Sequence, residues 1–170
     1  MRKLSVLVLL LLTVVGAFEG LNFLSEASLA KKASQSERRK PSASDVPFST
    51  IDTGAVSGVT SRDSFVIKDD GEWVGLWKRH TSNQFPGPPI PRVDFSSEMV
   101  VAVFAGERGS GGYQIQVDRI NDLGNRLVVA VSESYPGSGP GSDSHTMGMT
   151  HPFHIVRLAR SSLPVVFQGM

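Results

Sequence analysis

The sequence predicts an α+β domain in which one helix packs on a face of a mainly antiparallel sheet of about five to seven strands. Three observations lead to this prediction. Met99–Ala105 is apolar at every position and rich in β-branched residues, which is typical of a strand covered on both faces. Tyr113–Val117 alternates apolar and polar residues, as a strand with one buried face does. An apolar stripe at helical spacing follows Asp69, and this helix can cover the second face of the first strand.

The N-terminus has the pattern of an export signal. Arg2 and Lys3 precede the apolar run Leu4–Phe18, and small residues at its end fit a cleavage site. Residues 1–17 are therefore predicted to be a signal peptide or, if they are not cleaved, an N-terminal anchor. The expected location is outside the cytoplasm, either periplasmic or extracellular, with an uncleaved segment holding the protein at the inner membrane.

Residues 18–46 are predicted to be a disordered linker. The segment is basic and rich in serine, with few large apolar residues after Leu29. Beside a membrane its basic residues would attract anionic lipid headgroups, whereas after cleavage of the signal it would be a simple tether. Residues 47–170 are expected to form the β-rich domain.

The helix is predicted to begin at a capping aspartate. Asp69 with Glu72 three residues later gives a capping-box-like start. The apolar stripe that follows consists of Trp73, Leu76, Trp77 and His80. The proline-rich stretch Phe85–Pro91 cannot form a helix or a central strand, so it is expected to be a packed crossover rather than a ligand for another protein.

The remaining strands are expected from shorter apolar runs. The strand of Tyr113–Val117 should end or bulge at Asp118–Ile120, where the alternation slips. Leu163–Phe167 contains Pro164, which favours an edge strand or a strand start. The other predicted strands are Phe48–Ser57, Ser64–Ile67, Arg126–Glu133 and Phe153–Leu158.

Composition gives no sign of a nucleic-acid partner or a redox site. The 170 residues carry 17 basic and 16 acidic side chains, a net charge of +1. The chain has no cysteine, which excludes disulfides, thiolate metal ligands, a cysteine nucleophile and a lipid anchor on cysteine. Stability must therefore come from packing.

Five segments together resemble a known family. In order, they are Glu72-Trp73 with Leu76-Trp77, Val93–Ser96, Met99–Gly106, Gly111–Ile115 and His151–Val156. They resemble the C-terminal domain of the PrcB family, over roughly Ser64–Phe167. The family is named for an accessory subunit of a secreted bacterial protease complex. The resemblance implies a non-catalytic, extracytoplasmic domain that supports or stabilises a protease or another envelope assembly.

Two loops are the predicted binding surface. They are the glycine-rich segment Glu107–Tyr113 and the glycine-, proline- and serine-rich segment Tyr135–Gly148. If the strands around them follow one another as a meander, both loops emerge at the same end of the sheet. The candidate contacts with another envelope or secreted protein are Arg108, Ser110, Tyr113 and Tyr135.

No convincing catalytic set is present. Gly109–Gly112 superficially resembles the nucleophile loop of trypsin-like proteases, but those enzymes need two barrels and a far longer chain. Glu107 and Glu133 lie near loops, and the sequence gives neither a fixed partner. A small serine hydrolase that uses Ser110 with a late histidine is therefore kept only as an alternative function.

Histidine spacing does not predict a metal site. His151 and His154 would point to opposite faces of a strand, and His145 lies in the second loop beside a single carboxylate. No metal or other cofactor is predicted. A structural or self-associating envelope protein is the remaining alternative, in which Leu163–Phe167 would pair edge to edge with another chain.

Overall fold

The computed structural model describes residues 44–137 and 148–170. The predicted signal peptide, and the predicted linker up to residue 43, lie outside these residues. The domain begins slightly earlier than expected, because Ser44 and Asp45 already form a strand ahead of the predicted start at Pro47. No helix in the described part is both long and apolar enough to cross a membrane.

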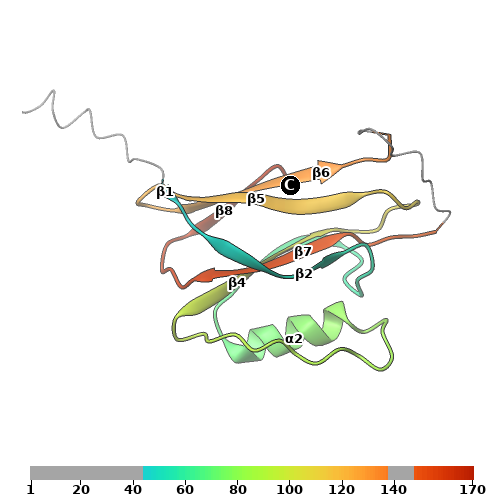
Figure 1. Cartoon of the computed structure of the whole chain (residues 1–170), viewed down its shortest axis with the longest axis horizontal. Coiled ribbons are helices and arrows are strands. Elements are labelled where there is room, and N and C mark those ends of the chain that lie inside the picture. Colours follow the sequence, from blue (N-terminus) through green and yellow to red (C-terminus); the bar gives the residue numbers. More distant parts are fainter. Residues whose placement is uncertain (1–43, 138–147) are drawn as a thin grey trace, which may run out of the picture. The chain divides into compact units, whose positions relative to one another are not determined.

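Eight strands in the described residues form two sheets of four, and one helix accompanies them (Figure 1). Sheet A has the order β1-β5-β6-β8 and sheet B the order β2-β7-β4-β3. All pairs are antiparallel except β6 with β8. The elements are β1 (Ser44–Asp45), β2 (Phe48–Gly54), β3 (Arg62–Ile67), α2 (Asp70–His80), β4 (Glu98–Ala105), β5 (Gln114–Asp122), β6 (Leu127–Ser134), β7 (Phe153–Ala159) and β8 (Val165–Gln168).

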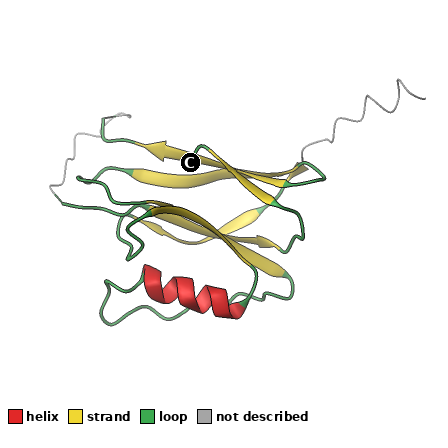
Figure 2. Cartoon of the chain, turned by 180° about the vertical axis from the view of Figure 1, so that it is seen from behind, coloured by secondary structure: helices red, strands yellow, loops and turns green. Residues whose placement is uncertain are grey.

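The α+β class with mainly antiparallel strands is confirmed, but the strands divide between two sheets and number eight rather than five to seven. The reason lies in β4, which is buried on both faces. Met99, Val101 and Val103 face the cluster shared with sheet A. On the other face, Val100, Ala102 and Phe104 pack in the cluster that includes the helix. Sheet B is thus the middle layer, with α2 on one face and sheet A on the other (Figure 2).

Helix α2 is held by its cap and by its two tryptophans. The Asp69 side chain accepts a hydrogen bond from the Glu72 backbone N–H at 2.9 Å, as predicted. The whole predicted stripe is buried, and the indole N–H groups of Trp73 and Trp77 donate to carbonyls of the proline-rich segment, Pro91 at 2.9 Å and Pro88 at 3.4 Å. This segment therefore crosses beside the helix as the sequence predicts, but it is less packed than expected, because most of its side chains are exposed and Phe85 is 101% exposed.

The chain changes sheets twice near the candidate loops. After β4 it leaves sheet B through Gly106 and joins sheet A as β5, so β4 and β5 are not neighbours in one meander. Gly106 has a φ of 78°, and a Cβ atom there would lie 2.7 Å from the Arg62 backbone nitrogen, so the crossing needs glycine. The strand directions still alternate, and the β4–β5 connection and the end of β6 lie at the same end of the domain, where Tyr113 meets Tyr135.

Candidate partner-binding surface

Three of the four predicted contact residues form one aromatic and cationic cluster. The Arg108 guanidinium lies over the Tyr113 ring, 5.7 Å from its centroid. Tyr113 in turn meets Tyr135 edge to face, with ring centroids 5.8 Å apart. Tyr135 is 55% exposed, whereas Tyr113 and Arg108 are half-buried. We call Arg108, Tyr113 and Tyr135, together with the neighbouring Ser110, the loop surface.

Glu133, at the end of β6, anchors this cluster. Its Oε2 accepts a hydrogen bond from Arg108 Nη2 at 3.0 Å. Its Oε1 lies 2.5 Å from Arg62 Nη2 as an ion pair. The Glu133 side chain is only 8% exposed, so its charge needs a partner, and Arg108, at 22% exposed, is less open to solvent than Arg62, at 40%. The sequence-based view that Glu133 has no fixed partner is wrong, because its partners lie far away along the chain.

Backbone bonds fix the glycine-rich loop. Arg108 and Thr150 exchange two backbone hydrogen bonds, of 2.8 and 2.9 Å. The Thr150 hydroxyl also donates to the Ser110 carbonyl oxygen at 2.9 Å. On the other side, the Glu107 N–H donates to the Thr60 carbonyl oxygen at 2.9 Å. The loop is therefore held between two other segments, which fixes the backbone around Arg108.

Ser110 lies in the glycine-rich loop, where its carbonyl oxygen accepts the Thr150 hydroxyl. Within residues 44–137 and 148–170, no hydrogen bond joins its hydroxyl to a histidine. His151 instead points its Nε2 to Glu107, 3.6 Å from Oε2. His145 lies outside the described residues. The contacts of Ser110, Arg108, Tyr113 and Tyr135 with a partner protein remain a prediction.

His154 is a structural residue between the two sheets. It is 4% exposed. Its Nδ1 accepts a hydrogen bond from the Val117 N–H at 2.9 Å, so the ring proton is on Nε2, which lies 2.8 Å from Thr50 Oγ1. Burial lowers the pKa of His154, and the nearby Asp118 carboxylate raises it less. No group of three metal-ligating side chains is found in the described part of the chain.

A serine–histidine–aspartate contact occurs elsewhere, and the sequence did not predict it. Ser57 Oγ lies 2.9 Å from His80 Nδ1, and His80 Nε2 lies 3.2 Å from Asp52 Oδ2. Ser57 is 1% exposed and its Oγ accepts the Val59 N–H, so no substrate reaches the hydroxyl. Burial lowers the pKa of His80 in spite of Asp52. The three residues join β2, the following loop and the end of α2, and this fits the predicted packed histidine.

The comparison with known families matches one region. Residues 99–159 match the family model described as PrcB C-terminal, a shorter range than the resemblance seen in the sequence. The match runs from β4 to β7 and contains the whole loop surface. No curated protein matches the chain, and no solved structure does.

Proposed function

We propose that this protein, whose residues 99–159 match the PrcB C-terminal family model, is an exported, non-catalytic accessory protein that binds another envelope or secreted protein. The family suggests a protease complex as the assembly that it supports. The observation that carries the proposal is the loop surface, in which Arg108, Tyr113 and Tyr135 are brought together and held in place.

The chemistry of this surface suits protein recognition. Arginine and tyrosine are enriched among the residues that dominate binding energy at protein interfaces. Glu133 fixes Arg108 from behind, and the ring of Tyr113 lies against both Arg108 and Tyr135. A side chain that is already positioned loses less conformational entropy when a partner binds. The loop surface is thus preorganised for binding.

The export part of the proposal rests on the N-terminal sequence. Arg2 and Lys3 ahead of the apolar run fit a secretion signal. The sequence has no cysteine to carry a lipid, so the proposed anchor of a retained protein is this apolar segment. The proposed location is periplasmic or extracellular. Cell fractionation of the full chain, with N-terminal sequencing of the exported form, tests both points.

The binding test is capture of partners from the native envelope fraction with the full exported protein as bait. We expect one stoichiometric protein, a protease or a component of its complex, in quantitative mass spectrometry. The double variant Arg108→Ala/Tyr113→Ala should lose at least about 90% of this protein, because truncation of central interface residues weakens binding by about 2 kcal/mol or more each.

The matched control is Arg126→Ala, which removes an exposed arginine in the turn at the opposite end of β5 and β6. It should capture the partner as the wild type does. Undiminished capture by the Arg108→Ala/Tyr113→Ala variant would refute the loop surface as the binding site.

One observation supports self-association as a second candidate function. Strand β8 lies at the edge of sheet A, and the ten residues from Ser161 to Met170 carry no charged side chain. Val166 is 42% exposed on this strand. Uncharged edge strands are templates for pairing with another chain. A molar mass that rises with concentration, and that Val166→Lys returns to the monomer value, would support this candidate.

A further inference from the structure

Sheet A has an open edge beside the loop surface. Strand β1 pairs only with Asn121 and Asp122 of β5, and one further bond joins Val46 N–H to the Ile120 carbonyl oxygen at 2.8 Å. The chain then turns away at Pro47 and continues in sheet B as β2 (Figure 1). Within the described residues, no strand pairs with the rest of β5, from Gln114 to Arg119, on the edge away from β6.

The backbone groups of this edge point outward. Val131 pairs with Val117 across β5 and β6, and its carbonyl oxygen lies on the β8 side, 2.0 Å from where a Cβ on Gly169 would be. Val117 and Val131 therefore form a non-hydrogen-bonded pair of the antiparallel ladder. The backbone N–H and C=O of Val117 point to the edge of β5 away from β6. The Val117 N–H is already bonded to the His154 ring, so only the Val117 C=O is left for an added strand. By alternation, Ile115 presents its N–H and C=O groups to the same edge.

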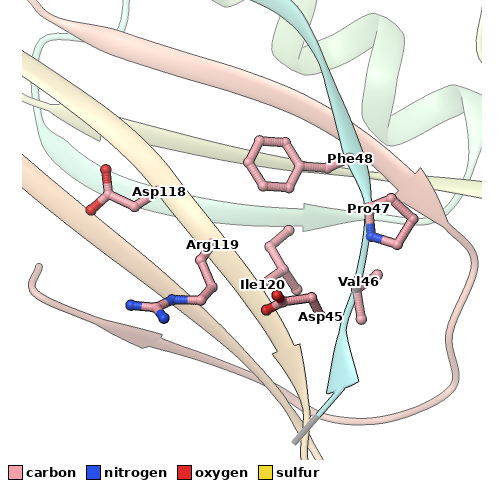
Figure 3. Close-up of a pocket in the computed structure, with 7 residues that line it drawn as sticks. All are labelled: Asp45, Val46, Pro47, Phe48, Asp118, Arg119 and Ile120. Atoms are coloured by element: carbon pink, nitrogen blue, oxygen red, sulfur yellow. The ribbon is translucent and has the colours of Figure 1, made fainter.

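The seam between β5 and the β1–β2 segment is hollowed at both ends. One cavity, of about 600 Å³, lies where Asp45 to Phe48 face Asp118 to Ile120. Figure 3 shows the Phe48 ring extending from β2 toward β5. A second cavity, of about 370 Å³, lies between Thr53–Ala55 and Gly112–Gln116. Tyr113 lines this second cavity and belongs to the loop surface, so the seam leads directly to that surface.

We infer that this seam binds an extended segment of the partner protein, which adds to sheet A as a strand along β5 in line with β1. The segment runs antiparallel to β5, with its C-terminal end at the loop surface, because β1 already has this orientation on the same edge. This inference rests on the proposed function and specifies how the partner is recognised.

The lining of the seam defines the chemistry of the segment. Phe48 and Ile120 give one cavity an apolar wall, which suits an apolar side chain that points between the sheets. Asp45 and Asp118 place two carboxylates at that end against the single guanidinium of Arg119. The segment therefore has a basic residue toward its N-terminal end and an apolar residue next to it.

The test uses a phage-displayed library of linear 12-residue peptides and the full exported protein. Ala55→Trp fills the second cavity, and Val56→Trp is its control, because Val56 is exposed next to the cavity without lining it. We expect peptides that bind the wild type and Val56→Trp equally but bind Ala55→Trp at least about 30-fold more weakly. Bound peptide should slow hydrogen exchange at Ile115, and N-methylation of alternate peptide residues should abolish binding.

Failure of the inference can be told apart from failure of the proposed function. If no peptide is enriched, or if Ala55→Trp binds the enriched peptides as the wild type does, strand addition is wrong. If Arg108→Ala/Tyr113→Ala no longer captures the envelope partner but Ala55→Trp still does, the proposed function holds and the seam is not the binding site. Capture that survives in both variants overturns the seam and the loop surface as binding sites, and the absence of any partner in captures with the wild type overturns the proposed function.

Discussion

Replacing Glu133 with glutamine should destabilise the domain and loosen the loop surface. The carboxylate is 8% exposed and holds Arg108 and Arg62. A hydrogen bond to a charged group contributes about 1.5–3 kcal/mol, and the ion pair with the 40% exposed Arg62 adds little because solvent screens it. Glutamine keeps the shape and one acceptor oxygen, so the expected loss is about 2 kcal/mol. For a domain of this size, Tm should fall by about 8 °C.

The control for this variant lies in the same region. Glu107→Gln is the same chemical change at a side chain that is 55% exposed and whose partner, His151, is 3.6 Å away. Thermal unfolding followed by circular dichroism should show a change of less than about 0.5 kcal/mol for it. A Glu133→Gln protein as stable as Glu107→Gln would refute the view that a buried carboxylate anchors the cluster.

Three further predictions concern the fold. Gly106→Ala should lower the free energy of unfolding by about 1–3 kcal/mol, measured in urea, because Gly106 has a positive φ and close neighbours. Gly109→Ala should be nearly neutral, because no atom lies near the added Cβ. Equal effects of the two substitutions would show that Gly106 is not needed at the crossing. Asp69→Ala should lower the free energy of unfolding by about 1 kcal/mol through loss of the cap, and no change in urea titration would show the cap to be unimportant. Burial lowers the pKa of His154 in the folded state, so below about pH 6.5 the unfolded chain binds a proton at this residue more readily than the folded protein does. The free energy of unfolding should therefore be highest above about pH 6.5 and decline as the pH falls. His154→Asn keeps an acceptor for the Val117 N–H, so urea titrations from pH 7.5 to 5 should show a shallower decline, and an unchanged slope would exclude His154 as its source.

The helix, its cap and the doubly covered strand could be predicted because each has a local signal. The apolar stripe from Trp73 to His80 shows which face of the helix is buried. The continuous apolar run of β4 shows that both faces of this strand must be covered. The division into two sheets has no such signal, because alternation in β5 shows which side chains are buried but not which strand lies beside it. Strand β1 is two exposed polar residues held by backbone pairing, so nothing in its side chains marks it.

The candidate surface was predicted in part for the same reason. Arg108 and Tyr113 belong to a loop whose glycines stand out, and the direction of the strands places Tyr135 near them. Glu133 and Arg62 act through contacts between distant parts of the chain, which one sequence does not reveal. The edge of β5 became visible only with the sheet order, since it depends on where the chain leaves sheet A.

Binding at the loop surface is tested directly by measuring the affinity between the partner captured from the envelope and the full exported protein. Calorimetry with wild type, Arg126→Ala and Arg108→Ala/Tyr113→Ala would compare the dissociation constants. We predict equal affinity for the first two and at least about 30-fold weaker binding for the double variant. Because Arg108→Ala also removes the hydrogen bond to Glu133, the Tm of the double variant should fall by about 8 °C, as in Glu133→Gln, so the titrations are made at a temperature at which circular dichroism shows it folded. Equal affinity for all three would show that the partner binds elsewhere and that the loop surface is not its binding site.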